Sequence, residues 1–243
     1  MANFYIEKSD ITENIATITG EEAQHISRVL RMKKGDEVTL CDGEGMFYEA
    51  VLSDFSDKTV TAEISSSRKA ETEPEVELTI FQGVPKNPKL ETIVQKLTEI
   101  GAVRIVPVDT KRAVAKLDKS AKVDRLRKIA REAAKQSKRG IVPEVMDAMN
   151  FKNAVKLASE ADLSIIAYEE EVETSLKMAL AGKTPKTVSV MIGPEGGFEK
   201  DEVELARENG LVSVTLGKRI LRTETAPLVI SAAVLYELGE MQL

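Results

Sequence analysis

The sequence contains very few of the residues from which disulfide scaffolds and metal centres are built. Its 243 residues include one cysteine, Cys41, and one histidine, His25. A disulfide framework needs paired cysteines, and zinc sites are built from several cysteine or histidine ligands. We therefore expect no internal disulfide and no metal ion in the chemistry of this protein.

Long apolar runs and the common nucleotide-binding signatures are absent as well. No run of about 18 apolar residues occurs, and the opening stretch MANFYIEKSD lacks the basic and apolar segments of a secretory signal, so we expect a cytosolic protein. No G-x-G-x-x-G motif follows the first strand, and neither a P-loop motif nor a G-x-S-x-G elbow is present. These absences disfavour a dinucleotide-dependent dehydrogenase, a P-loop NTPase and a serine hydrolase.

Charge is distributed unevenly along the chain. The net charge is −6, which by itself argues against a nucleic-acid partner. Residues 86–139, however, hold 16 basic and 6 acidic side chains, whereas residues 140–243 hold 10 basic and 17 acidic ones. Such segregation predicts one basic surface on an otherwise acidic protein, and this surface favours a polyanionic partner.

The first 70 residues have the pattern of a small β domain. Two runs of alternating polarity flank the stretch DGEG at residues 42–45, which is a hairpin signal, and KTVTAEI predicts a further strand. A helix over EAQHISRVLRM is expected to begin at Thr19, because Glu22 lies at capping-box spacing. The polar stretch 65–75 indicates a linker, so we expect domains at residues 1–70 and 76–243.

The second domain alternates apolar strands with helices. Strands are predicted for ELTIFQG, VRIVPV, LSIIAY, TVSVMIG and VSVTLG, and a helix between the first two is expected to end at Gly101. Another helix begins at about Ser120 and carries an apolar stripe. The residues of that stripe are Val123, Leu126, Ala130 and Ala133. The alternation is typical of an α/β fold with a mostly parallel sheet covered by helices on both faces.

Polar or glycine-rich segments follow three of these strands. Ligands of open parallel sheets bind beyond the carboxyl ends of the strands, so GPEGGF, KRILRTETAP and EEEVET are candidate binding loops. GPEGG is also typical of a tight strand-to-helix turn that binds nothing. Arg219 and Arg222 precede a helix, where positive charge opposes the helix dipole. That cost favours an anionic partner, either a ligand or Glu224 within the chain.

Basic side chains recur in two helical segments. Those of the helix near Ser120 are Lys128, Arg131, Lys135 and Lys138. Those of the N-terminal helix are Arg28 and Arg31, which share one side loosely with His25. Solvated helix faces and a structural histidine are the alternatives to RNA contact. The concentration of positive charge in residues 86–139 favours RNA for the first segment.

Five stretches carry a resemblance to a known family. IGPEGGFEKDEVELARENG and VTLGKRILRTETAPLVISAAVL resemble the C-terminal signature of the SPOUT methyltransferases, specifically the family that methylates N3 of a uridine in 16S ribosomal RNA. ETIVQKLTEIGAVRIVPV and KIAREAAKQSKRGIVPEV continue it upstream, and QHISRVLRMKKGDEV is similar to that family's PUA-like RNA-binding β-barrel. The resemblance implies a deep trefoil knot at the C-terminal end, which general rules of chain topology do not predict.

The resemblance also implies which residues bind S-adenosylmethionine and RNA. Those expected to bind the cofactor are Gly193, Pro194, Glu195, Gly196, Gly197, Leu216, Gly217, Ile220, Leu221, Thr225 and Ala226. Those expected to contact RNA are His25, Arg28, Arg31, Lys128, Arg131, Lys135, Gln136 and Lys138. Arg222 is the expected catalytic residue, with Arg139 second, and no residue is an evident general base.

The implied reaction transfers a methyl group to N3 of a 16S rRNA uridine near the decoding region. The implied partners are 16S rRNA or the 30S subunit and a second copy of the chain, since LVISAAVLYEL is apolar nearly all round and calls for burial. Two alternatives stay open: a non-catalytic RNA-binding or ribosome-assembly protein, and a SPOUT methyltransferase acting on tRNA or another rRNA atom. The first leaves the glycine-rich strand exits unexplained.

Overall fold

The computed structural model describes residues 2–86, 88–117 and 120–242, and in that part the chain forms two compact units. Unit 1 runs up to Glu73 and includes Ala134–Val142. Unit 2 consists of Pro74–Ala133 and of the chain from Pro143 onward. The chain therefore leaves unit 1 after Glu73 and returns to it once, through a short segment.

Unit 1 contains a six-stranded sheet, counted over the residues that the structure describes. Its strands are β1 (Ala2–Tyr5), β2 (Ile11–Thr12), β3 (Ile15–Thr19), β4 (Glu37–Cys41), β5 (Met46–Phe55) and β6 (Thr59–Lys69). They lie in the order β1-β4-β5-β6-β3-β2, and all pairs are antiparallel except β1 with β4. The β4–β5 hairpin pairs Cys41 with Phe47 across residues 42–45, which confirms the predicted turn.

The core of unit 1 is filled by inward-facing side chains of the strands. Phe4, Ile18, Leu40 and Leu52 are fully buried together with Ile26. Burying aliphatic and aromatic side chains of this size stabilises a domain by roughly 1.5–3 kcal/mol each. The returning segment joins a neighbouring cluster, in which Ala134 packs with Tyr5, Cys41 and Phe47.

Three local predictions for unit 1 differ from the structure. Residues 65–69 belong to β6 and not to a linker, because their exposed polar side chains still pair with β5 through the backbone. The N-terminal helix starts after Thr19, as predicted, but Thr19 makes no side-chain bond there, and α1 (Gly20–Gln24) gives way to a π-helical turn, His25–Val29. Arg31 lies beyond the helix with a φ of 52°, so it does not share a helix face with His25.

Unit 2 contains a parallel sheet. Its strands are β7 (Glu77–Gly83), β8 (Arg104–Asp109), β9 (Glu144–Val145), β10 (Met149–Asn150), β11 (Leu163–Ala167), β12 (Thr187–Ile192) and β13 (Val212–Val214). The order is β10-β8-β7-β12-β11-β13, with β9 paired to β8, and every pair is parallel. All five predicted strands are confirmed. The two additional strands, β9 and β10, are too short to produce a sequence pattern.

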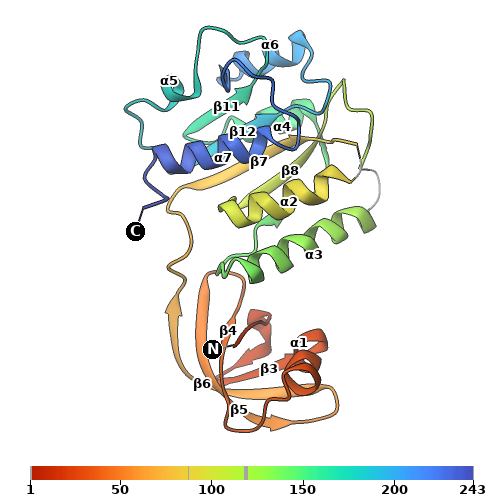
Figure 1. Cartoon of the computed structure of the whole chain (residues 1–243), viewed down its shortest axis with the longest axis vertical. Helices are drawn as coiled ribbons and strands as arrows, with labels where there is room; N and C mark the ends of the chain where they lie inside the picture. Colours follow the sequence, from red (N-terminus) through yellow and green to blue (C-terminus); the bar gives the residue numbers. More distant parts are fainter. Residues whose placement is uncertain (1, 87, 118–119, 243) are drawn as a thin grey trace. The chain divides into compact units, whose positions relative to one another are not determined.

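Helices cover both faces of this sheet, as predicted. They are α2 (Lys89–Ile100), α3 (Ser120–Gln136), α4 (Phe151–Ala158), α5 (Leu176–Leu180), α6 (Lys200–Glu208) and α7 (Ala226–Glu237). One core lies between the sheet and α2, α3, α5 and α7, and the other lies between the sheet and α4 and α6. Figure 1 shows α2 and α7 beside one another on the same face.

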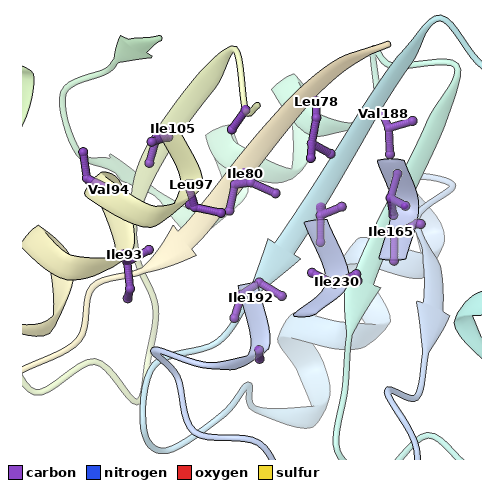
Figure 2. Packing of buried hydrophobic residues seen from close by; sticks show 14 of the residues in the cluster. Leu78, Ile80, Ile93, Val94, Leu97, Ile105, Ile165, Val188, Ile192 and Ile230 are labelled. Atoms are coloured by element: carbon purple, nitrogen blue, oxygen red, sulfur yellow. The ribbon is translucent and has the colours of Figure 1, made fainter. Parts of the chain in front are cut away.

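The larger core interdigitates strand and helix side chains. Figure 2 shows Ile80 of β7 and Ile105 of β8 near Leu97 of α2, with Ile192 of β12 and Ile230 of α7 in the same cluster. Alternate residues of β7 face opposite sides, so Phe81 belongs to the core under α4 and α6. This packing fixes the carboxyl ends of the central strands, where the predicted binding loops begin.

The last connection, residues 215–225, runs from β13 at one edge of the sheet to α7, which packs against α2, α5 and β7. Helix α7 begins at Ala226 after Thr225, with Pro227 in its first turn, close to where the sequence predicted it. Such a return over several strands is compatible with the trefoil knot, which remains a prediction.

Candidate functional site

The carboxyl ends of the parallel strands in unit 2 share one edge of the sheet. Loops leave that edge after β7, β8, β11, β12 and β13. The three predicted exits, after β11, β12 and β13, are three of these loops. The parallel topology therefore gathers the candidate segments at one edge, although they are separated in the sequence.

The loop after β12 approaches its neighbours so closely that only glycine fits at several positions. A Cβ on Gly83, at the end of β7, would lie 2.6 Å from Pro194 Cδ. A Cβ on Gly197 would lie 2.0 Å from Glu169 Oε1, and Gly197 has a φ of 68°, which disfavours other residues. The Gly197 N–H donates to Pro194 O at 3.0 Å, so the stretch also forms the tight turn that its sequence indicated.

Lys89 holds the loops after β12 and β13 together. Its Nζ lies 3.2 Å from Glu195 Oε1 and 3.0 Å from Glu224 Oε2. The hydrogen bond to Glu224 is the main reason why the pKa of Lys89 is raised, and the same bond lowers the pKa of Glu224. Glu224 is thus chiefly the partner of Lys89, because Arg222 Nη1 is 3.9 Å from its other oxygen.

Arg222 extends away from the loop that carries it. Its side chain is 84% exposed, although Thr223, the next residue, is buried. Thr223 Oγ1 donates to Gly193 O at 2.9 Å, which ties the loop after β13 to the loop after β12. A cationic group is therefore presented to solvent from an anchored backbone, beside the glycine-rich turn.

Arg112, in the loop after β8, fastens the glycine-rich loop from its other side. Its Nη1 donates to Gly196 O at 2.9 Å and its Nε donates to Glu199 Oε1 at 2.8 Å. The neighbouring Lys111 N–H donates to Glu202 Oε1 at 2.9 Å. Arg112, Lys111 and Lys89 are not among the site residues that the sequence predicted. The signal was present for the first two, since they directly follow Asp109 and Thr110 at the exit of a predicted strand.

The acidic loop after β11 is organised by one of its own carboxylates. Glu171 Oε1 accepts the N–H groups of Glu173 and Thr174 at 2.9 and 3.2 Å, and its Oε2 accepts Arg207 Nη2 at 2.7 Å. The bond from the Glu173 N–H contributes most to lowering the pKa of Glu171 to about 2. The run EEEVET thus includes a carboxylate with a structural role.

Two of the basic residues expected to meet RNA or substrate form ion pairs within unit 1. Arg139 is 4% exposed, and its Nε and Nη2 donate to Glu73 Oε2 at 3.0 and 2.6 Å. Lys135 Nζ lies 2.7 Å from Glu22 Oε1, also at a largely buried position. Both charges are therefore paired with carboxylates of unit 1, which disfavours the predicted catalytic role of Arg139 and the predicted RNA contact of Lys135.

The remaining basic candidates differ in exposure. Arg28, Arg31, Lys128, Gln136 and Lys138 are exposed, and Arg131 is partly buried. Lys138 follows the end of α3 with a φ of 58°, so it does not continue the helical row. His25 is partly buried and its ring meets Phe4 edge-on at 6.0 Å between centroids, which fits the structural role considered for it.

Two further properties bear on the choice of chemistry. Among the residues that the structure describes, no group of three or more His, Cys, Asp or Glu side chains is arranged to bind a metal ion. In the same part of the chain, no helix has both the length and the apolar character needed to cross a membrane.

Family models match both parts of the chain. Residues 72–235 match an RNA methyltransferase domain, and residues 18–65 match an RNA methyltransferase PUA domain. The first match covers most of unit 2, and the second lies within unit 1.

Relatives with known names match almost the whole length. The ribosomal RNA small subunit methyltransferase E of Bacillus subtilis is 40% identical over 98% of this chain and 97% of its own. The protein of the same name from Synechocystis is 32% identical over 94% of this chain and 75% of its own. A crystal structure of ribosomal RNA small subunit methyltransferase E from Neisseria gonorrhoeae, bound to S-adenosyl methionine, superimposes with a TM-score of 0.87 at 30% identity and covers all of both chains.

Proposed function

This chain belongs to the RNA methyltransferase family with an N-terminal PUA domain, and from that premise we propose that it methylates N3 of a uridine in 16S rRNA, near the decoding region, with S-adenosylmethionine as methyl donor. The observation that carries the proposal is the edge of the unit 2 sheet. There the glycine-rich turn after β12 lies next to the anchored loop after β13, which presents the exposed Arg222.

The residues at this edge fit an adenosyl cofactor. A Cβ on Gly193, Gly196 or Gly197 would lie within about 3 Å of the loop itself or of a neighbouring side chain, so these glycines allow the loop after β12 to pack tightly. Gly217 has a φ of 104° and open space where a Cβ would stand. We propose that the cofactor binds the loops after β12 and β13 through the following residues: Gly193, Pro194, Glu195, Gly196, Gly197, Leu216, Gly217, Ile220, Leu221, Thr225 and Ala226. The trefoil knot is part of this proposal.

In the proposed reaction, the protein mainly positions the methyl donor against the uridine and stabilises the negative charge that develops on the base. When bound, S-adenosylmethionine supplies a methyl group activated by a sulfonium centre. As N3 of the uridine loses its proton, negative charge spreads onto O2 and O4, and Arg222 would stabilise it as an oxyanion hole does. Water or hydroxide is the proposed proton acceptor. The uridine has to be unpaired or flipped, because N3 is buried in a Watson–Crick pair.

We propose that RNA is bound by basic and polar side chains of both units, most of which are exposed. These are Arg28, Arg31, Lys128, Arg131 and Lys138, together with Gln136 and His25. Phosphate attracts such side chains independently of base sequence, so they would give affinity and register rather than the choice of uridine. The substrate would be 16S rRNA or the 30S subunit, in the cytoplasm where subunits are assembled, and the enzyme would act as a homodimer.

Two measurements test the proposed function. Calorimetry with S-adenosylmethionine tests the cofactor, and absence of binding would refute the enzymatic proposal in favour of a non-catalytic RNA-binding protein. Methyl transfer to 30S subunits from cells lacking the protein, followed by nucleoside mass spectrometry, tests the reaction. The expected product is 3-methyluridine in 16S rRNA. Another modified nucleoside, or transfer to tRNA, would refute the assigned atom or substrate.

A further inference from the structure

Two buried polar side chains connect the candidate loops to the end of β7. Gln82 and Thr223 are 0% and 6% exposed. Gln82 Nε2 donates to Thr223 Oγ1 at 3.1 Å, and Thr223 Oγ1 in turn donates to Gly193 O at 2.9 Å. A chain of hydrogen bonds therefore joins a central strand, the glycine-rich turn and the loop that carries Arg222.

The orientation of the Gln82 amide follows from its surroundings. Its Nε2 also lies 3.0 Å from Gly83 O and 3.4 Å from Gly193 O, so the nitrogen faces oxygens on several sides. A flipped amide would place its own oxygen against them, where it could donate nothing. The Oε1 atom is buried and has no hydrogen-bond partner among the residues that the structure describes.

An unpaired buried acceptor lowers the stability of the folded chain. An apolar side chain of similar size at this position would avoid that cost. The Gln82 amide therefore lowers stability but provides directed hydrogen bonds. Those bonds reach the loops after β12 and β13, which belong to the proposed active site. Buried polar networks of this kind specify geometry more than they add net stability.

Thr223 is the inner anchor of the segment that presents Arg222. On its other side, Glu224 pairs with Lys89, but both partners of that pair are about a third exposed. Partly exposed ion pairs are screened by solvent and hold position weakly. The Arg222 carbonyl accepts the N–H groups of Thr225 and Ala226 at the start of α7, and the buried bond from Thr223 to Gly193 links this segment directly to the glycine-rich turn.

We propose that Gln82 and Thr223 are positioning residues for methyl transfer, which align the Arg222 loop with the turn that begins at Gly193. This inference rests on the proposed function. It assigns neither residue a contact with the reacting atoms. Their effect on the rate passes through the placement of Arg222 and of the cofactor loop.

The experiment compares Thr223→Val, Thr223→Ser and Thr98→Val with the wild-type chain. Valine is nearly isosteric with threonine and lacks the hydroxyl, whereas serine keeps it. Thr98 is a matched control, because it is also fully buried and its Oγ1 donates to Val94 O at 2.8 Å within α2. The measurements are single-turnover methyl transfer to 30S subunits, S-adenosylmethionine affinity by calorimetry, and thermal unfolding.

We expect Thr223→Val to lower the single-turnover rate about 10- to 100-fold, as misplacement by roughly an ångström does in other enzymes. Thr223→Ser and Thr98→Val should retain the wild-type rate. Gln82→Leu should lower the rate in the same direction as Thr223→Val with little loss of thermal stability, because it removes the unpaired oxygen. A purely structural role would instead couple the loss of rate to the loss of stability.

A double-mutant cycle separates positioning from a general effect. If Thr223 acts through Arg222, Thr223→Val should slow the Arg222→Ala enzyme far less than it slows the wild-type enzyme. Equal losses in both backgrounds, or a Thr223→Val rate equal to that of Thr98→Val, would overturn the inference while leaving the proposed function intact. A wild-type chain that binds no S-adenosylmethionine would refute the proposed function and this inference with it.

Discussion

At the scale of single residues, charged side chains at the edge of the unit 2 sheet differ in their role. Some hold neighbouring loops together through ion pairs, whereas Arg222 points into solvent. Lys89, Arg112 and Glu171 are engaged with partners from other segments. Arg222 is mostly exposed and has a distant carboxylate contact. A cation used to stabilise a transient anion has to be available to that anion, and Arg222 is presented from a backbone anchored by the neighbouring Thr223, so it is the candidate for this role.

Replacement of Arg222 tests that choice. Arg222→Ala should lower the methyl-transfer rate about 100- to 1,000-fold, as loss of one oxyanion-stabilising donor does, with thermal unfolding unchanged. S-adenosylmethionine affinity, measured by calorimetry, should stay close to that of the wild type. Arg219→Ala is the matched control, because Arg219 is an exposed arginine of the same loop. Equal losses in the two variants would show that the loop needs positive charge in general and would remove the specific role of Arg222.

Glu171 gives a prediction about pH. Its pKa is about 2 in the folded chain and 4.5 as the ordinary value, so the unfolded chain binds the proton more tightly. The stabilisation by Glu171 is therefore complete above about pH 4.5 and is lost as the pH falls toward 2. Glu171→Gln should be less stable than the wild type by on the order of 2 kcal/mol at pH 7, and the difference should shrink between pH 4.5 and 2.

Urea unfolding of both proteins over this pH range measures the effect. The control is Glu173→Gln, which changes an exposed carboxylate of the same loop. A stability difference between Glu171→Gln and the wild type that does not change with pH would contradict the prediction.

At the scale of elements, the helix that follows the glycine-rich turn is tied to the exit of β8. Glu202 of α6 is buried, and its two oxygens accept the N–H groups of Lys111 and Glu199 at 2.9 Å each. One carboxylate therefore caps α6 and fixes the loop that carries Arg112. Glu199 and Glu202 form a capping box, since they are three residues apart at the start of α6.

Removal of the Glu202 carboxylate should weaken both the start of α6 and its attachment to the loop after β8. Glu202→Ala leaves two N–H groups without their acceptor, and we expect a loss of about 2–3 kcal/mol in the free energy of unfolding. Glu204→Ala, at an exposed position of the same helix, should change stability by less than about 0.5 kcal/mol. Chemical denaturation measures both, and similar values for the two variants would contradict the assignment.

At the scale of the whole molecule, α7 combines a buried face with exposed apolar side chains. Ile230, Val234 and Leu235 are buried in the large core, whereas Val229 and Tyr236 are 43% and 70% exposed. Apolar side chains on an exposed helix face are typical of an interface. The predicted homodimer would cover this face.

A charge on that face tests the dimer. Tyr236→Glu should shift the protein toward the monomer at micromolar concentration, because an unpaired carboxylate at an interface is costly to bury. Light scattering coupled to size-exclusion chromatography measures the mass. Ile15→Glu, at an exposed apolar position of unit 1, is the control and should leave the mass unchanged. A Tyr236→Glu protein of wild-type mass would place any interface elsewhere.

The sequence by itself determined the elements whose residues carry a period. The apolar strands β7, β8, β11 and β12 and the helices α2 and α3 were predicted because burial on one or two faces imposes a repeat on neighbouring residues. The hairpin at residues 42–45 follows from local turn chemistry in the same way. Local sequence patterns did not predict the polar end of β6, because that segment is held in the sheet by backbone hydrogen bonds to β5 and buries no apolar side chains.

Only the tertiary structure decided which charged residues are available for function. Arg139 and Arg222 look alike in the sequence, yet one is buried against Glu73 and the other is exposed. Likewise, nothing local links Gln82 to Thr223, which are 141 positions apart and meet through one hydrogen bond. Composition and period describe what a segment can bury, but a polar side chain takes its role from partners that the fold brings to it from distant segments.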